Sequence, residues 1–182
     1  MGLRKGHCYS TLKDRPYTRK SKVKSKSYIK TTPPMKIAKF VMGDISGFFK
    51  KKYHFNVSLI ATEPVQIRDN AIEASRQVIH RHLEKKTKGA YYFVVNVYPH
   101  HVLRENKMLT GAGADRMQTG MQLSFGKPVG IAARINTEGR IFSVACNKGM
   151  VPAVRNILLK VKSKLPGKKA IIVKKLEGKK ER

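Results

Sequence analysis

Acidic residues are scarce in this chain: 11 Asp and Glu stand against 39 Lys and Arg among 182 residues, a formal net charge of +28. A charge of this size repels itself in a compact state and indicates a polyanionic partner. The two polyanions to consider are nucleic acid and an anionic membrane. Composition alone therefore indicates that the protein binds one of these two polyanions.

Other absences narrow the class further. The chain has no run of 18 apolar residues, which excludes a bilayer-spanning helix, and no basic helix with a large aromatic face, which weighs against a membrane-surface protein. Cys8 and Cys146 are its two cysteines, so neither a zinc site nor a disulfide framework is indicated, and a reducing intracellular compartment is expected. The 41% hydrophobic content suffices for a core, and the length suits one domain with tails or two small domains.

The positive charge is concentrated at the two ends. Residues 1–60 hold 15 basic and 2 acidic residues, residues 61–140 hold 12 and 7, and residues 141–182 hold 12 and 2. Within residues 1–35, Asp14 alone opposes ten Lys and Arg, and Tyr9, Tyr17 and Tyr28 interrupt them without any helical or strand period. We therefore predict a nucleic-acid-binding arm over 1–35, with cations on phosphates and Tyr rings on unpaired bases. The alternative is a solvated tail.

Apolar periodicity predicts a folded core over 36–176, followed by a charged tail over 177–182. Alternation and β-branched runs predict strands, and spacings of three to five predict two helices. The fold class is α+β: a two-layer sandwich of an antiparallel or mixed sheet with two packed helices. The expected strands are 37–43, 55–61, 91–98, 129–135, 141–145 and 170–173, with 101–105 as partner of 91–98, and the expected helices are 62–88 and 151–165. The chain from Lys174 is expected to be loose.

Catalytic and cofactor motifs are not found. Gly111 and Gly113 begin like a dinucleotide fingerprint, but its third glycine would fall on Arg116. His80 and His82 differ by two on a predicted helix, so they diverge and cannot share a metal ion. We predict no enzyme activity, no catalytic residue, no metal and no cofactor.

A long segment over 106–127 lacks any clean period. It combines four glycines with Lys, Arg, Gln and Met side chains. Segments of this length inside a compact domain are usually functional or disordered. We predict a finger that enters a nucleic-acid crevice, with Gln at base edges and Arg at phosphates. The alternative is a mobile surface loop whose Met side chains pack on the core.

Four motifs point to a known family. They are HVLRENKML over 101–109, AGADRMQTGM over 112–121, FGKP over 125–128 and the pair Ala133-Arg134. With them, essentially the whole chain resembles a large-ribosomal-subunit protein family, called L-ten-e in archaea and eukaryotes and L-sixteen in bacteria. The AGADRMQTGM block is highly specific to it. The Lys- and Ser-rich residues 19–35 depart from the eukaryotic pattern and favour the archaeal branch.

The resemblance implies a structural constituent of the cytoplasmic ribosome that is not a catalyst. Family members bind 23S-type rRNA, approach 5S rRNA and have neighbouring ribosomal proteins, and their loop points toward the peptidyl-transferase region and the tRNA acceptor end. No membrane and no homo-oligomer are expected. The predicted rRNA-binding residues are Arg4, Lys5, His7, Arg15, Arg19, Lys20, Arg104, Lys127 and Arg134. The predicted loop residues near tRNA are Lys107, Met108, Gly113, Asp115, Arg116, Met117, Gln118, Gly120 and Met121.

Two other hypotheses stay open from the residues alone. A non-ribosomal RNA-binding or assembly protein would bind generic duplexes as tightly as rRNA. An enzyme acting on nucleic acid would need a converging titratable pair, and the sequence offers none.

Overall fold

The computed structural model describes residues 4–12, 16–17, 23–26, 29–108, 111 and 120–176. Helices and strands account for most of these residues. The strands are β1 Val41–Gly43, β2 Phe55–Ala61, β3 Val65–Arg68, β4 Tyr92–Val95, β5 His101–Glu105, β6 Lys127–Ile135, β7 Arg140–Cys146 and β8 Lys169–Lys175. The helices are α1 Ile45–Phe49, α2 Asp69–Thr87 and α4 Val151–Lys162, and the 3-10 helices are η1 Gly6–Tyr9, η2 Lys24–Lys26 and η3 Lys148–Met150.

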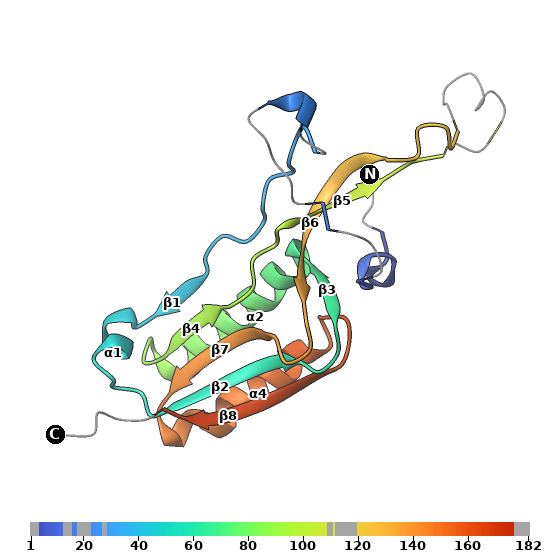
Figure 1. The fold of residues 1–182 in the computed structure, drawn as a ribbon. Coiled ribbons are helices and arrows are strands. Elements are labelled where there is room, and N and C mark those ends of the chain that lie inside the picture. The colour runs from blue at the N-terminus through green and yellow to red at the C-terminus, as the bar shows by residue number, and fades with distance from the viewer. Residues whose placement is uncertain are drawn as a thin grey trace.

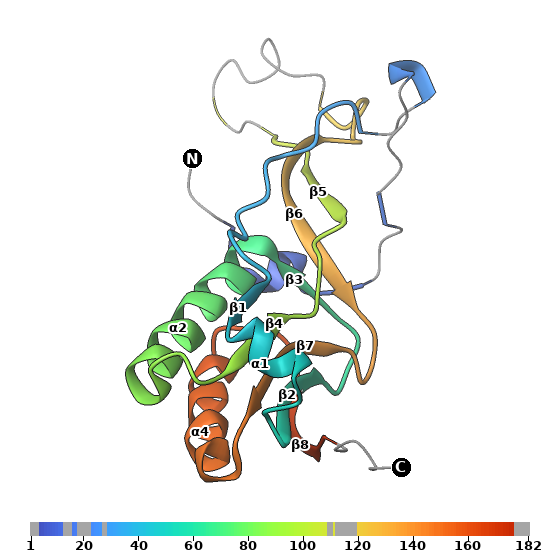
Figure 2. The same ribbon diagram turned by 90° about the vertical axis from the view of Figure 1, so that its left-hand side faces the viewer.

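A five-stranded antiparallel sheet forms the centre of the molecule. Its strand order is β1-β4-β7-β2-β8. Helices α2 and α4 lie side by side on one face of this sheet (Figures 1 and 2). The opposite face is turned toward the viewer in Figure 1 and is not covered by either of these helices.

The two long helices pack on the sheet through periodic apolar side chains. Ile72, Ile79 and Leu83 of α2 are fully buried, as are Val154 and Leu158 of α4. Spacings of four, seven and eleven place such residues on one helical face. The sheet contributes large, fully buried side chains to the core, among them Leu59, Phe93 and Phe142.

An ion pair on α2 fixes the segment that leads into β1. The Arg76 Nη2 and Nε atoms donate to the two carboxylate oxygens of Glu73 at 2.6 and 2.8 Å. The Ala38 backbone N–H donates to Glu73 Oε2 at 3.3 Å, and Gln77 donates to Oε1. These donors, Arg76 first, lower the pKa of Glu73 to about 2. The carboxylate therefore stays charged and joins α2 to residues 36–40.

A second, three-stranded antiparallel sheet has the order β3-β6-β5. We call β5 and β6 together the ribbon. The ribbon extends away from the five-stranded sheet, and η1 lies near β3 (Figures 1 and 2).

The α+β fold class with two packed helices is confirmed, and its strands form two antiparallel sheets. The predicted helix over 62–88 is wrong at its start, because residues 65–68 form strand β3 and the helix begins at Asp69. Val65 and Ile67 are buried, and all four residues pair with β6. Pairing with a strand far along the chain therefore decides this segment.

The predicted pairing of 101–105 with 91–98 is also wrong, because β5 pairs with β6. The strand within 91–98 is shorter than predicted and covers Tyr92–Val95. The first strand begins later, at Val41. The last strand runs on to Lys175 through its ladder with β2, so the chain is not loose from Lys174. Helix α1 was not predicted. Asp44 caps it by accepting a hydrogen bond from the Gly47 N–H at 2.8 Å.

Candidate nucleic-acid interface

The N-terminal segment is held against the three-stranded sheet by backbone and side-chain bonds. Gln66 of β3 donates from Nε2 to the Tyr9 carbonyl at 2.8 Å and from its backbone N–H to the Ser10 carbonyl at 3.0 Å. Arg134 of β6 donates from Nη2 to the Leu12 carbonyl at 3.0 Å. The segment over residues 9–12 therefore lies across β3 and β6, and η1 ends at its first residue, Tyr9.

A second attachment joins this segment to the ribbon. The Arg4 guanidinium pairs with the Glu105 carboxylate, with Nε at 2.8 Å from Oε1. The Arg4 side chain is 60% exposed while that of Glu105 is 12% exposed. Arg68 lies over the Tyr9 ring at 5.8 Å, within the range of a cation–π contact. Exposed Lys5 and His7 lie in the same short segment.

Arg104 connects the arm to the end of the long loop. Its guanidinium carbon lies 3.8 Å from the ring centroid of Tyr17 and 4.1 Å from that of Phe125. Its Nη1 also donates to the Phe125 carbonyl at 2.6 Å. The Tyr17 N–H donates to His101 Nδ1 at 2.9 Å. Arg104 is thus half-buried between two aromatic rings, one from the arm and one from the loop.

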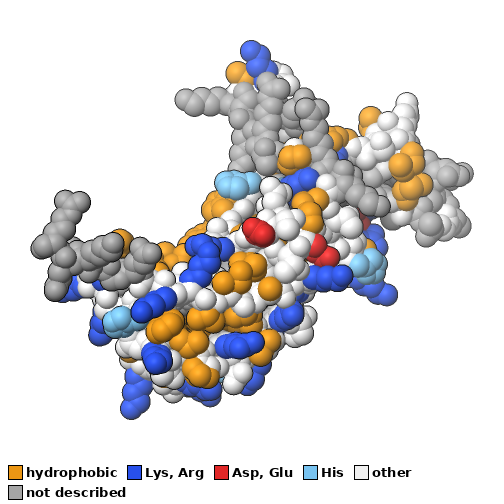
Figure 3. Space-filling model, turned by 60° about the horizontal axis from the view of Figure 1, so that its bottom comes forward, with side chains coloured by type: hydrophobic (Ala, Val, Ile, Leu, Met, Phe, Trp, Pro, Cys, Tyr) orange, Lys and Arg blue, Asp and Glu red, His pale blue; other side chains and the backbone are white. Residues whose placement is uncertain are grey.

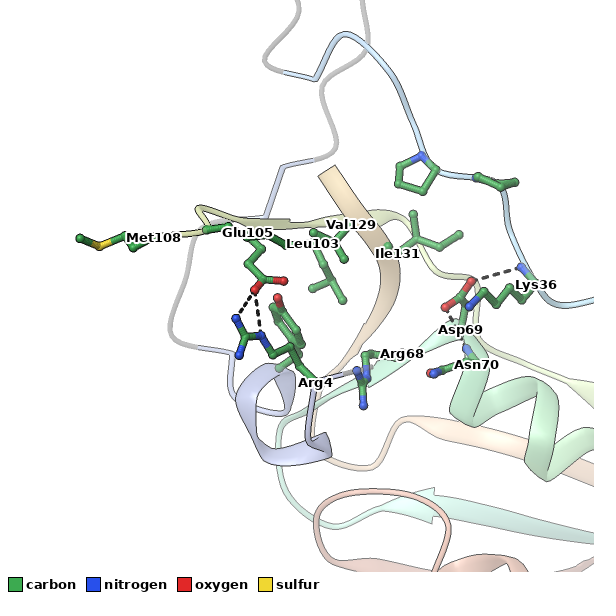
Figure 4. Close-up of a pocket in the computed structure, with 15 residues that line it drawn as sticks. Arg4, Lys36, Arg68, Asp69, Asn70, Leu103, Glu105, Met108, Val129 and Ile131 are labelled. Carbon is green, nitrogen blue, oxygen red and sulfur yellow. Dashed lines mark hydrogen bonds and ion pairs between the residues drawn. The ribbon is translucent and has the colours of Figure 1, made fainter. Parts of the chain in front are cut away.

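A cavity of about 750 Å³ opens along the ribbon (Figure 4). Its cations come from separate parts of the chain: the N-terminal segment, the segment before β1, the end of β3 and the chain after β5. These are Arg4, Lys36, Arg68 and Lys107. The rest of the lining is largely apolar or aromatic and includes Tyr9, Pro33, Pro34, Leu103, Met108, Val129 and Ile131.

The two carboxylates of this cavity already have partners. Asp69, at the start of α2, accepts from the Lys36 backbone N–H at 3.2 Å and from the Asn70 N–H at 2.8 Å. Glu105 pairs with Arg4. The cavity therefore offers mainly positive charge to a ligand, at the N-terminus of a 19-residue helix. Elsewhere too, Lys and Arg side chains far outnumber acidic ones on the face shown in Figure 3.

The loop meets the ribbon at a narrow neck. Gly126 has a φ of +78°, and a Cβ there would lie 2.7 Å from the Glu105 carbonyl carbon. Only glycine fits this close approach of two backbones. Asn106 Nδ2 donates to the Gly120 carbonyl at 3.4 Å on the other side of the neck. Beyond the neck the chain exposes Met108, Met121, Leu123 and Phe125.

The predicted residues fall into three groups. Arg4, Lys5, His7, Lys107, Met108, Gly120, Met121 and Lys127 lie around the cavity, the N-terminal segment and the neck. Arg104 and Arg134 also lie there, but each donates a hydrogen bond to a backbone carbonyl of this chain. Outside the described residues are Arg15, Arg19, Lys20, Gly113, Asp115, Arg116, Met117 and Gln118.

Sequence reasoning missed three residues of this interface: Lys36, Gln66 and Arg68. The signal for two of them was the alternation Val-Gln-Ile-Arg over 65–68, in which Gln66 and Arg68 share the face opposite the buried Val65 and Ile67. Lys36 has no such signal, because its position depends on the path of the chain before β1.

Two searches restricted to the described residues concern other kinds of site. No group of three His, Cys, Asp or Glu side chains there could hold a metal ion. No helix in that part of the chain is long and apolar enough to cross a membrane.

Comparison with known proteins identifies the chain. The family model for "Ribosomal protein L16p/L10e" matches residues 12–172. A "Large ribosomal subunit protein uL16" of Sulfolobus acidocaldarius is 45% identical over 169 residues, which are 91% of this chain and 90% of that protein. The protein of the same description from Staphylothermus marinus is 40% identical over 178 residues, 97% of each chain. That of Hyperthermus butylicus is 42% identical over 172 residues, 91% of this chain and 90% of the relative.

These matches define the class as a protein of the large ribosomal subunit. Within that class, the chain belongs to the ribosomal protein L16p/L10e family. The resemblance found in the sequence is thereby confirmed, including its archaeal character. The predicted location on the ribosome and the prediction that the chain is not an enzyme follow from the same membership.

Proposed function

We propose that this chain binds large-subunit rRNA through the arm over 1–35, the cavity along the ribbon and the neck of the loop. The observation that carries the proposal is the cavity, where cations from four segments converge while both carboxylates already have partners. A phosphate group would replace water at these cations without displacing an internal salt bridge, except at Arg4.

The composition of the cavity suits RNA in particular. Its apolar and aromatic walls can pack against the face of an unpaired base, and its cations can bind the attached phosphates. Phosphate neutralisation with counterion release would supply most of the affinity. RNA shape and unpaired bases would supply specificity, because side chains cannot read the narrow major groove of an RNA helix.

We further propose that the loop over 106–127 helps to shape the tRNA-binding cleft near the peptidyl-transferase centre, with 5S rRNA and other ribosomal proteins as neighbours. The support is the family resemblance of this block and the apolar side chains exposed beyond the neck, Met108, Met121 and Leu123. Met adapts to irregular surfaces such as a folded RNA. Gly126 and Asn106 at the neck hold the two ends of the loop together.

Cofractionation tests the rRNA-binding proposal. In a native lysate on a sucrose gradient, the full chain should sediment with the large subunit at low salt and leave it at high salt, because phosphate contacts are screened. Sedimentation with bulk protein at low salt would contradict the proposal. A free RNA-binding or assembly protein would then be the better account.

The loop proposal is tested by Arg116→Ala, a residue outside the described part of the chain. Subunits reconstituted with this variant should accommodate tRNA about tenfold more slowly, as expected for the loss of one charge-assisted hydrogen bond. Arg81→Ala removes the same charge from an exposed site on α2 and serves as the matched control. Equal translation rates with both variants would exclude a role for Arg116 at tRNA.

A further inference from the structure

The uncovered face of the five-stranded sheet carries an ordered arrangement of polar side chains. Strand register places Tyr92, Ala145, Asn56 and Lys174 in one row across the sheet. The next row contains Val94, Ser143, Ser58 and Ile172. The small residues Ala145, Ser143 and Ser58 are buried between larger neighbours. They form the floor of a shallow depression.

This depression is a hollow of about 180 Å³. Its walls are the rings of Phe48 and Tyr92, which stack with centroids 4.0 Å apart and planes 14° from parallel. Ligand sites for drug-sized molecules usually measure about 300–1,000 Å³, so this volume suits a single planar ring. The remaining lining comes from Asn56, Val94, Asn96, Arg140, Ser143 and Ala145.

Hydrogen-bonding groups in the hollow are only partly satisfied from within. Asn96 Nδ2 donates to Ser143 Oγ at 3.0 Å, and Ser143 Oγ lies 3.2 Å from Ser58 Oγ. Among the described side chains, the buried Asn56 Oδ1 has no hydrogen-bond partner. An unpaired buried acceptor costs free energy unless a ligand or water donates to it. The amide of Asn56 is therefore available to a polar ring edge.

The rim of the hollow is positively charged. Arg140 lies on its wall and exposed Lys174 lies in the same row as Asn56. Exposed Lys50 and Lys51 follow directly after α1, which contributes Phe48. The nearby carboxylate of Asp44 already accepts from the Gly47 N–H and the Tyr53 hydroxyl and forms an ion pair with Lys52. A ligand that combines a planar ring with negative charge complements this surface.

We propose that this hollow is a second RNA contact that receives one unpaired base, with the flanking phosphates on Arg140 and Lys174. The inference rests on the proposed rRNA binding for its ligand class and adds a separate site on another sheet. Stacked rings beside amide and hydroxyl groups on a sheet suit base recognition, whereas an uncharged peptide would leave the excess positive charge unpaired.

A charge-matched pair of variants tests the position of the site. The probe is a fluorescein-labelled single-stranded RNA of mixed sequence, about ten nucleotides long, bound to the full chain. Arg140→Ala with Lys174→Ala should weaken binding about tenfold. The control, Arg155→Ala with Lys160→Ala, removes the same charge from exposed positions on α4, across the sheet. Equal weakening by both pairs would overturn the inference, because overall charge would then account for it.

Side-chain amide resonances test whether a base enters the hollow. The RNA should shift the NMR signals of the Asn56 and Asn96 side chains, and inorganic polyphosphate, which has no bases, should leave them unchanged. Unshifted signals at RNA saturation, or the same shifts with polyphosphate, would overturn the inference while the proposed function stands. A chain that also fails to bind an rRNA fragment would overturn both.

Discussion

Raising the salt concentration from about 50 to about 200 mM should weaken binding of the full chain to a large-subunit rRNA fragment by about 10³-fold or more. The reason is the net charge of +28, with four cations gathered around one cavity. If about ten phosphates are engaged on duplex RNA, the slope of log K against log salt approaches roughly −9, and it is shallower on single strands. Fluorescence anisotropy across a salt series measures this slope.

Individual cations of the cavity should contribute separately to the slope. Arg68→Ala and Lys107→Ala should each reduce its magnitude by about 1, because each removes one phosphate contact. Arg81→Ala on α2 is the control and should leave the slope unchanged. Binding that is insensitive to salt, or equal effects of all three variants, would count against the cavity as the electrostatic centre of the interface.

The second large effect concerns the stability of the scaffold. Phe142→Ala should lower the free energy of unfolding by about 3–5 kcal/mol. Phe142 is fully buried in β7, and its ring centroid lies 5.8 Å from that of Phe93. Removing the ring leaves a cavity between the sheet and the helices that the rigid neighbours cannot fill.

Phe49→Ala is the matched control for this prediction, because it makes the same change at a side chain that is 75% exposed. It should alter the free energy of unfolding by no more than about 0.5 kcal/mol. Urea unfolding followed by circular dichroism measures both variants. Similar midpoints for the two would show that Phe142 does not belong to the cooperative core.

The parts of the fold that could be predicted are those set by local pattern. The face of α4 followed from the spacing of Val154, Leu158 and Val161, all of which are fully buried. Strand β3 could not be predicted in this way, because Ile67 continues the helical spacing of Ala71 and Ala74. Its strand conformation depends on pairing with β6, where Ile67 lies opposite Ala133. Contacts so distant in sequence leave no local signal.

The interface was predictable in its charge but not in its internal partners. Composition and the loop motif indicated that cations such as Lys107 and Lys127 would contact RNA at or near the long loop. Composition could not show that Arg104 lies between two aromatic rings or that Arg134 binds the Leu12 carbonyl. Those roles depend on where the arm crosses the ribbon, which is set by tertiary structure.

The position of Arg104 between Tyr17 and Phe125 has a thermodynamic consequence for ligand binding. One guanidinium contacts both the arm and the neck of the loop, so an event that orders one of them also favours order in the other. Linkage is reciprocal: if RNA on the arm favours one arrangement of the neck, a ligand that selects this arrangement must strengthen RNA binding by the same factor. The coupling free energy between the arm and the neck therefore depends on the Arg104 contact. It can be measured as the effect of the neck ligand on RNA binding or as the effect of RNA on binding of the neck ligand.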